Sequence, residues 1–271
     1  MDIDSGTRQA WDFVEHTGKS IFLTGKAGTG KTTFLRSLKA HSHKRMVVVA
    51  PTGVAAINAG GVTIHSFFQL PLSPYLPNTT FDNRFSYSKE KRKIMRTIDM
   101  LVIDEISMVR SDVLDAVDNV LRRFREHDKP FGGVQLVMIG DLHQLTPVTR
   151  PDEEALLKQY YDTPYFFGSH ALKNVDYVTI ELKHVYRQQD EDFLKILNDV
   201  RDGHVTTDDL NALNSRYNPT FRPNADDGYI RLTTHNRKAD DYNRYELQAL
   251  TTKMYTFDAQ IEKDFPEYDY P

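Results

Sequence analysis

The chain of 271 residues contains no cysteine, and no apolar run approaches the roughly 18 residues that span a bilayer. The first absence excludes disulfides, thiolate metal sites and cysteine nucleophiles, and it suits a reducing compartment. The acidic N-terminus also lacks the apolar stretch of a secretory signal. We therefore expect an intracellular protein with no membrane partner, in the cytoplasm of a bacterium or in the nucleus or a mitochondrion of a eukaryote.

The chain also lacks an excess of positive charge. Its formal net charge is -4, which gives no overall attraction to nucleic acid, so any such binding must come from local surfaces. Core-forming residues are plentiful, because hydrophobic residues make up 39% and aromatic residues 11% of the chain. These values predict a folded protein with one large domain or two smaller ones.

Short apolar runs rich in β-branched residues recur along the chain, with helical patterns between them. Each run is apolar on both faces, which is typical of a buried parallel strand. One intervening pattern places five apolar residues on a single helical face. This alternation predicts an α/β fold with a parallel sheet covered on both sides. The predicted strands are residues 21–24, 46–50, 100–103, 136–139 and 178–180, and the helical face consists of Val113, Leu114, Val117, Leu121 and Phe124.

Two stretches depart from this alternation. Residues 69–96 begin with prolines that no central strand or helix interior accommodates, and they continue into a basic segment, so we expect a small insertion there. After about residue 182, polar helical patterns replace the apolar runs. We expect a first domain over residues 1–181, carrying the inserted subdomain, and a second, incomplete domain over residues 182–271 that ends in an acidic stretch.

The strongest local motif runs from Gly25 to Thr32 and matches the phosphate-binding pattern G-x-x-x-x-G-K-[ST]. It follows a predicted strand and precedes a helical pattern, a context in which backbone N–H groups and the helix dipole hold phosphate oxygens. The lysine reaches the β- and γ-phosphates, and the threonine hydroxyl ligates Mg²⁺. The alternative is a glycine-rich turn that only links strand to helix. The expected ATP contacts are Gly25, Ala27, Gly28, Thr29, Gly30, Lys31, Thr32 and Thr33.

Two further strand ends carry polar residues that suit the same site. Asp104 and Glu105 follow one predicted strand directly, which predicts Asp104 as the second Mg²⁺ partner and Glu105 as the base that polarises the attacking water. Gly140 and Asp141 lie at the end of another predicted strand, and Gln144 in the loop that follows is placed to contact the γ-phosphate. The alternatives are solvated acids that cap a strand and a plain turn. A second carboxylate favours hydrolysis over phosphoryl transfer to a metabolite.

These motifs occur in a familiar order. GKAGTGKT is followed by APTGVAAINAGGVTIHSFF, VIDEISMV, GDLHQLTPV and LKHVYRQ. In this order they closely resemble the superfamily-one DNA helicases of the petite-integration-frequency (PIF) family, relatives of RecD, over roughly residues 9–243. The resemblance implies two RecA-like P-loop domains with ATP between them and single-stranded DNA across both. It also implies ATP hydrolysis that drives 5′-to-3′ movement and unwinds duplex DNA.

The resemblance further assigns residues. It implies that Gln9 reads adenine and that Arg187 reaches the γ-phosphate from the second domain, where an arginine neutralises charge as the phosphate departs. The alternative for Arg187 is a surface arginine. Implied DNA contacts come from hydroxyls, glycine amides and imidazoles that bind phosphate oxygens, and from a phenylalanine that stacks on bases. Core packing of the phenylalanines and helix capping by Thr234 or Asn236 are the alternatives. The implied DNA-contacting residues are Thr52, Gly53, His65, Ser66, Phe67 or Phe68, Thr234, His235 and Asn236.

The resemblance also places a fork-contacting wedge on the proline-rich residues 70–77. The cations of residues 89–96 then become candidates for contact with a phosphate backbone, with a solvated helix face as the alternative. Family members continue well past residue 271, so we expect a truncated chain.

The leading interpretation is the motor portion of an ATP-dependent DNA helicase that uses Mg-ATP and acts as a monomer on single-stranded and fork DNA. One rival is a nucleotide- and single-stranded-DNA-binding module without efficient turnover. Another is a small-molecule kinase or GTPase, although the chain has no N-K-x-D guanine motif. The pathway, whether repair, recombination, replication or telomere maintenance, stays open.

Overall fold

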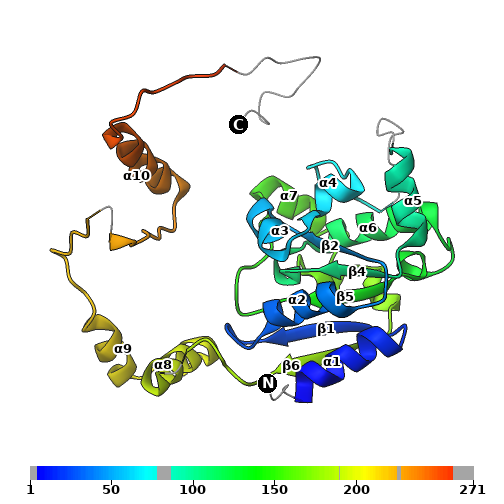
Figure 1. Ribbon diagram of the computed structural model, residues 1–271, viewed down its shortest axis with the longest axis horizontal. Helices are drawn as coiled ribbons and strands as arrows, with labels where there is room; N and C mark the ends of the chain where they lie inside the picture. Colours follow the sequence, from blue (N-terminus) through cyan, green and yellow to red (C-terminus); the bar gives the residue numbers. More distant parts are fainter. Residues whose placement is uncertain (1–4, 78–86, 189, 225–226, 259–271) are drawn as a thin grey trace. The chain divides into compact units, whose positions relative to one another are not determined.

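The structure is a computed structural model that describes residues 5–77, 87–188, 190–224 and 227–258 (Figure 1). The chain forms two compact units, Met1–Leu210 and Asn211–Pro271. Residues 182–210, which we expected to begin the second domain, belong to the first of these units. In the described ranges, no helix combines the length and the apolar character that a membrane crossing requires.

A six-stranded sheet forms the centre of the first unit, with the strand order β3-β2-β4-β5-β1-β6. Its neighbouring strands are all parallel, so their carboxyl ends meet at one edge of the sheet. The five predicted strands are confirmed, whereas β3 was not predicted and is only two residues long. The strands are β1 (Ser20–Gly25), β2 (Met46–Ala50), β3 (Val62–Thr63), β4 (Met100–Ile103), β5 (Gln135–Ile139) and β6 (Tyr177–Leu182).

Strand β6 differs from the other predicted strands because it lies at an edge of the sheet, beside β1. Its Thr179 and Glu181 side chains are exposed, while Ile180 and Leu182 are buried. The prediction that this run is buried on both faces is therefore wrong, because the edge strand is covered on one face only. Strands β4 and β5 are buried along their whole length, as predicted.

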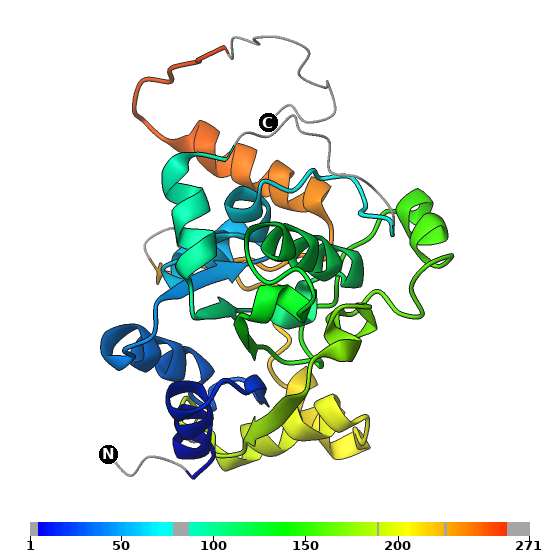
Figure 2. The ribbon, with the colours of Figure 1, turned by 90° about the vertical axis from the view of Figure 1, so that its right-hand side faces the viewer.

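Helices cover both faces of the sheet, which confirms the predicted α/β architecture (Figure 1, Figure 2). Helices α1 and α2 share one hydrophobic cluster with Val102, and helix α6 shares the other with Ile103, since successive strand residues point to opposite faces. The helices are α1 (Ser5–His16), α2 (Lys31–His41), α3 (Gly53–Ala59), α4 (Ile64–Phe68), α5 (Lys89–Thr97), α6 (Ser111–Phe124), α7 (Pro151–Leu157), α8 (Glu191–Asp202), α9 (Thr207–Asn214) and α10 (Asn236–Ala249).

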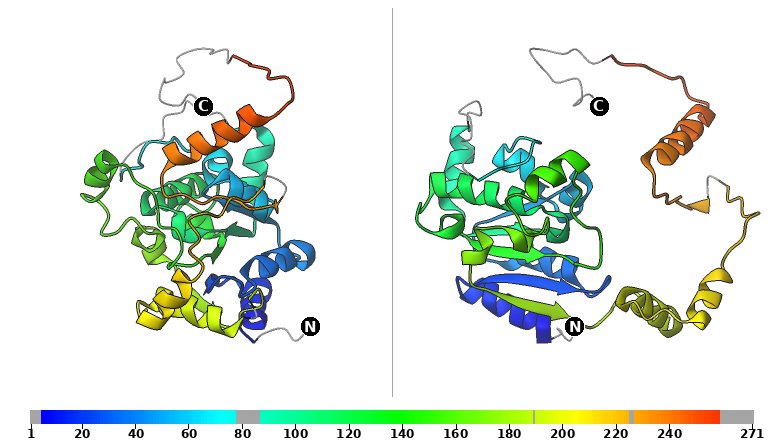
Figure 3. Two further views of the ribbon diagram at one scale, coloured as in Figure 1. Left: turned by 90° about the vertical axis from the view of Figure 1, so that its left-hand side faces the viewer. Right: turned by 180° about the vertical axis from the view of Figure 1, so that it is seen from behind.

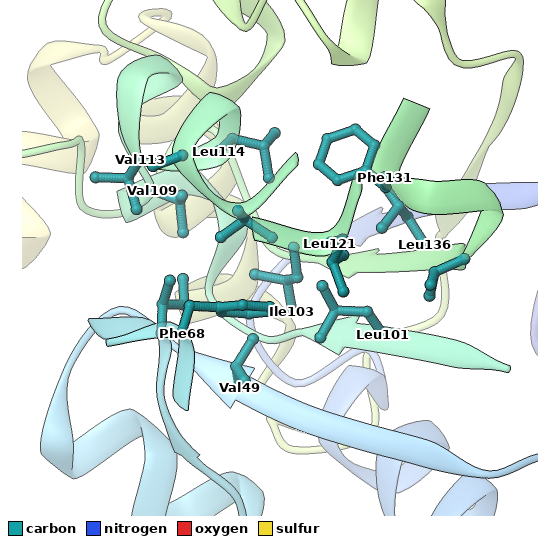
Figure 4. Packing of buried hydrophobic residues seen from close by; sticks show 14 of the residues in the cluster. Val49, Phe68, Leu101, Ile103, Val109, Val113, Leu114, Leu121, Phe131 and Leu136 are labelled. Carbon is teal, nitrogen blue, oxygen red and sulfur yellow. The ribbon is translucent and has the colours of Figure 1, made fainter. Parts of the chain in front are cut away.

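The packing of α6 follows its sequence pattern. The four predicted apolar positions nearest its start, from Val113 to Leu121, are buried, and Phe124 packs against the same cluster as a partly buried residue. Figure 4 shows Leu114 and Leu121 between this helix and the strand residues Leu101 and Ile103. Each fully buried leucine contributes roughly 1.5–3 kcal/mol to stability. The predicted helical face is therefore confirmed.

The stretch that we expected to be an insertion lies partly outside the described residues, since nothing is described between residues 77 and 87. Residues 70–77 form no helix or strand, as their prolines predict. Helix α5 follows, capped by Ser88, whose side chain accepts a hydrogen bond from the Lys91 N–H. Met95 is the buried residue of α5, Lys91 is half-buried, and Lys89, Arg92, Lys93 and Arg96 are exposed.

The second unit contains the last residues of α9, helix α10 and irregular chain (Figure 3). The guanidinium of Arg231 lies 4.1 Å from the ring centre of Tyr242, a cation–π contact, and the rings of Phe221 and Tyr229 meet edge to face at 5.0 Å. Ile230 and Leu232 are highly exposed. The acidic C-terminal stretch of residues 262–271 lies outside the described residues.

Candidate nucleotide-binding site

The predicted phosphate loop connects β1 to α2 at the carboxyl edge of the sheet. Its glycines have positive φ angles of 147° at Gly25, 81° at Gly28 and 96° at Gly30, which side-chain-bearing residues rarely adopt. A Cβ atom on Gly25 would lie 2.5 Å from the carbonyl oxygen of Leu182, so glycine is also required for space. Gly30 caps α2 without a side-chain hydrogen bond, which leaves the first N–H groups of α2 suited to an anion.

Lys31 extends across this loop. Its ammonium donates hydrogen bonds to the carbonyl oxygens of Gly25 at 2.5 Å and Lys26 at 3.1 Å. Burial lowers the pKa of Lys31, although the charges of Asp141 and Glu105 act in the opposite direction. The structure thus brings the predicted Lys31 and the predicted Glu105 close enough for their charges to interact.

Asp104 and Glu105 begin directly after β4, as predicted. Burial raises the pKa of Asp104, against a hydrogen bond from the N–H of Glu105 at 3.0 Å and the charge of Lys31. Burial and the charge of Asp104 also raise the pKa of Glu105. A carboxylate whose pKa moves toward neutrality is suited to act as a general base.

The backbone of Glu105 is strained. Its φ and ψ angles are 50° and 44°, in the left-handed region that a residue with a side chain seldom occupies. Such a conformation costs on the order of 1–2 kcal/mol and recurs at functional sites. This left-handed conformation at Glu105 produces a sharp turn of the chain between β4 and the short 3-10 helix Ile106–Met108.

The loop after β5 approaches this turn closely. A Cβ atom on Gly140 would lie 2.9 Å from Ile106 Cγ2 and 3.1 Å from the Ser107 backbone nitrogen, so only glycine fits. The side-chain amide of Gln144 donates to Asp141 Oδ2 at 3.2 Å. Gln144 is exposed, and Asp141 is 1% exposed. Contact between Gln144 and a γ-phosphate stays a prediction.

Helix α8 adds two residues that the sequence analysis did not identify. Lys26 of the phosphate loop donates to Asn198 Oδ1 at 2.5 Å. Both terminal N–H groups of the Arg201 guanidinium donate hydrogen bonds to the Asp141 carboxylate, to Oδ2 at 2.7 Å and to Oδ1 at 2.9 Å. The sequence indicated only a polar helix here, because nothing local to α8 shows which loops its polar face contacts.

Arg187 lies beside the phosphate loop. The N–H of Tyr186 donates to the carbonyl oxygen of Gly28 at 2.9 Å, and a Cβ atom on Gly28 would lie 2.7 Å from the Cβ atom of Arg187. The Arg187 side chain is exposed. Gln9 lies on the exposed face of α1, and no hydrogen bond between described residues links it to the loop. Their predicted roles toward ATP stay predictions.

The site suits Mg²⁺ bound together with phosphates. The described residues contain no group of three or more His, Cys, Asp or Glu side chains that would hold a metal ion by itself. Thr32 in the first turn of α2 and Asp104 offer a hydroxyl and a carboxylate, and Mg²⁺ in phosphate-transfer sites takes one or two such protein ligands plus substrate oxygens. The donor set therefore fits the predicted ion.

The predicted DNA-contacting residues of the first unit lie at the starts of α3 and α4, which follow β2 and β3. Thr52 caps α3, accepting the N–H of Ala55 at 3.2 Å, and exposed Gly53 begins that helix. The N–H of Ser66 donates to the capping side chain of Thr63 at 3.2 Å. Because the strands are parallel, these helix starts lie at the same sheet edge as the phosphate loop.

His65 and the two phenylalanines of α4 face inward to different degrees. Burial and the charge of Arg110 lower the pKa of His65, so its imidazole is neutral near pH 7. Phe67 is 7% exposed and Phe68 fully buried, with their rings edge to face at 4.8 Å. This burial agrees with the alternative of core packing for both rings, and stacking of either ring on a base stays a prediction.

In the second unit, Thr234, His235 and Asn236 lead into α10. The capping residue is His235, and it makes no capping hydrogen bond with its side chain. The alternative that Thr234 or Asn236 caps the helix is therefore wrong. Thr234 Oγ1 instead lies 2.8 Å from His235 Nδ1, and all three residues are exposed.

Comparisons with known proteins identify the family of this chain. A family model described as PIF1-like helicase matches residues 8–211. The human ATP-dependent DNA helicase PIF1 is 36% identical over 251 residues, which cover 89% of this chain and 36% of the human protein. This chain therefore spans roughly a third of the length of the curated relatives.

Two solved structures match over the whole chain. The crystal structure of Pif1 helicase from Bacteroides in complex with ADP-AlF3 and single-stranded DNA gives a TM-score of 0.91 at 39% identity, covering 100% of this chain and 62% of that one. A structure of two coordinating Pif1 helicases at forked double-stranded DNA gives a TM-score of 0.88 at 39% identity, covering 100% and 63%. On its matched residues, its fold and its motif order, the chain belongs to the PIF1-like helicase family.

Proposed function

We propose that this chain binds Mg-ATP and forms the nucleotide-hydrolysing part of a DNA helicase that moves 5′-to-3′ on single-stranded DNA and unwinds duplex DNA. The observation that carries the proposal is the convergence of Lys31, Asp104, Glu105 and Asp141 at the sheet edge where α2 begins without a side-chain cap. Cations, a helix N-terminus and carboxylates meet there as a Mg-nucleotide requires.

In this proposal the chain's own residues divide the work. Thr32 and Asp104 hold Mg²⁺, which supplies charge neutralisation at the phosphates when it is bound. Glu105 accepts the proton of the attacking water, and its raised pKa suits that role. Lys31 and Arg187 stabilise negative charge as the γ-phosphate departs. The remaining nucleotide contacts are Gln144 at the γ-phosphate, Gln9 at adenine, and the loop amides of Gly25, Ala27, Gly28, Thr29, Gly30 and Thr33.

DNA would follow the sheet edge beside the nucleotide. Thr52, Gly53, His65 and Ser66 lie at helix starts there, and neutral imidazole, hydroxyl and amide groups bind phosphate oxygens without reading sequence. The exposed cations of α5 add attraction to a duplex backbone ahead of the motor. In the second unit, we propose that Thr234, His235 and Asn236 contact the same strand.

The related structures bear on the partners. One relative is described with single-stranded DNA and another as two coordinating helicases at forked DNA. We propose that single-stranded and fork DNA are the partners of this chain, bound by a monomer, in a bacterial cytoplasm, nucleus or mitochondrion. We propose that residues 1–181 and 182–271 form the two RecA-like domains, and that residues from about 69 to 96 form the wedge subdomain that contacts the DNA fork.

The test compares two site variants with two surface controls in the 271-residue chain. Lys31→Ala is expected to abolish Mg-ATP binding in calorimetry. Glu105→Gln is expected to bind ATP and to slow any DNA-stimulated hydrolysis by roughly 10²–10⁴-fold. Lys158→Ala and Glu154→Gln alter an exposed ion pair at the end of α7 and should match the parent chain. If Lys31→Ala binds ATP like the parent, the proposed site is wrong.

A second candidate is a nucleotide- and single-stranded-DNA-binding module without efficient turnover. The observation behind it is that the match with the human relative covers 36% of that protein. A site that uses groups from a more complete second domain would bind ATP and hydrolyse it poorly. Measurable DNA-stimulated turnover by the 271-residue chain would exclude this candidate.

A further inference from the structure

Helix α8 contacts two loops of the nucleotide site with one face. Asn198 accepts a hydrogen bond from Lys26 of the phosphate loop, and Arg201 donates two hydrogen bonds to Asp141 in the loop after β5. Residues three positions apart lie on the same side of a helix, so one surface of α8 makes both contacts. All four residues belong to the first compact unit.

Asp141 is the junction of these contacts. Its carboxylate accepts the Arg201 fork, the backbone N–H of His143 at 3.0 Å and the side-chain amide of Gln144 at 3.2 Å. Burial would raise the pKa of Asp141, but the hydrogen bonds from Arg201 and His143 and the charges of Arg201 and Lys31 outweigh it and lower the pKa. The buried carboxylate is therefore ionised at neutral pH, with Arg201 as its hydrogen-bonded cation.

We propose that Arg201 is a positioning residue of the nucleotide site, which neutralises Asp141 and thereby keeps Lys31 free to serve the γ-phosphate. This inference rests on the proposed function. Arg201 is not proposed to contact the phosphates or the attacking water, because it acts through the Asp141 carboxylate to which it is hydrogen-bonded.

The reason lies in the competition for Lys31. Without Arg201, the other cation that acts on Asp141 is Lys31, and the carboxylate would attract that ammonium away from the phosphates. An unpaired buried carboxylate would also repel a triphosphate. The γ-phosphate brings the additional negative charge that distinguishes ATP from ADP, so the effect should fall mainly on nucleotides with three phosphates.

The experiment measures the affinity for ATPγS and for ADP, each with Mg²⁺, by calorimetry. Arg201→Gln is expected to lose on the order of tenfold in affinity for ATPγS and clearly less for ADP. Adding Asp141→Asn removes the unpaired charge, so the double variant should regain most of the ATPγS affinity. A merely structural role of Arg201 predicts no such recovery.

The controls separate charge from folding. Lys195→Ala removes another α8 cation, which pairs with Asp199 and Asp209 rather than with the nucleotide site, and it should bind both nucleotides like the parent. Arg201→Lys keeps the positive charge and should retain more ATPγS affinity than Arg201→Gln. Should Arg201→Gln fail to fold, the double variant carries the test, and it must bind ATPγS nearly as tightly as the parent.

The outcomes distinguish the two proposals. A parent chain that binds neither nucleotide overturns the proposed function and this inference with it. A parent that prefers ATPγS, with an Arg201→Gln variant that keeps the same preference, overturns only the role of Arg201. Equal loss of both nucleotides without recovery in the double variant also overturns it.

Discussion

The strained backbone of Glu105 allows the stability cost of the proposed catalytic base to be measured directly. Two substitutions separate its components. Glu105→Gln removes the charge of a partly buried carboxylate but keeps a side chain in the left-handed region, whereas Glu105→Gly removes the charge and also the strain. The difference between the two variants therefore reports the strain.

The expected magnitude follows from the φ angle of 50° at Glu105. A left-handed backbone costs a residue with a side chain roughly 1–2 kcal/mol, and glycine loses about 0.5–1 kcal/mol more than alanine when it is ordered. The glycine variant should therefore be about 0.5–1 kcal/mol more stable than the glutamine variant. For a urea m value of about 2 kcal/mol per molar, this corresponds to an unfolding midpoint roughly 0.25–0.5 M higher.

The pH dependence has a definite sign. Burial raises the pKa of folded Glu105 above its unfolded value, so the folded state binds the proton more tightly and stability falls as pH rises through that range. Glu105→Gln should therefore be more stable than the parent at pH 7, and this gain should vanish below about pH 4, where the carboxyl is protonated in both states.

The assay is urea unfolding followed by tryptophan fluorescence. The chain has a single tryptophan, Trp11, which packs against the core of the first unit, so the signal reports the unit that contains Glu105. A glycine variant no more stable than the glutamine variant would refute the strain argument. Both variants should bind ATP and hydrolyse it at least about 10²-fold more slowly than the parent.

Three further predictions concern other parts of the first unit. Gly28→Ala places a methyl group at a residue with a φ angle of 81° and within 2.7 Å of the Arg187 Cβ atom. It should therefore lower the free energy of unfolding by about 1–3 kcal/mol in the Trp11 assay and weaken nucleotide binding in calorimetry. Unchanged nucleotide affinity would contradict this packing. Phe67→Ala should cost about 3–5 kcal/mol by the same assay, while lost DNA affinity at unchanged stability would favour stacking. Burial would raise the pKa of Glu15, but hydrogen bonds from Ser42 and His43 lower it to about 2. Glu15→Gln should therefore destabilise the protein at pH 7, and this loss of stability should disappear as pH falls from about 4 toward 2. A loss of stability that is the same at every pH would contradict this.

Much of the sheet and of the nucleotide site could be predicted because its signals are local. A buried parallel strand is a short apolar run, and a phosphate loop is defined by glycine, lysine and threonine at fixed spacing. Asp104 and Glu105 were recognised because they directly follow an apolar strand. In a parallel sheet such strand ends meet at one edge, so three local motifs predicted one site.

The features that were missed depend on contacts between distant segments. Asp141 and Arg201 are 60 residues apart, and no pattern around either residue indicates the other. The two-residue strand β3 is too short to show a period. Phe67 and Phe68 have the same side chain that a stacking surface would use, and only the packing of α4 shows that both are buried.

The carbonyl of Gly28 and the ammonium of Lys26 are hydrogen-bonded to Tyr186 and Asn198, which belong to the protein itself. The phosphate loop therefore gives up much of its conformational entropy when the protein folds, and less is lost on binding. Nucleotide affinity is consequently linked to these two hydrogen bonds, and substitutions that remove either of them will weaken ATP binding even though they touch no ligand. The residues that order the phosphate loop, Tyr186 and Asn198, lie more than 150 residues after it in the sequence.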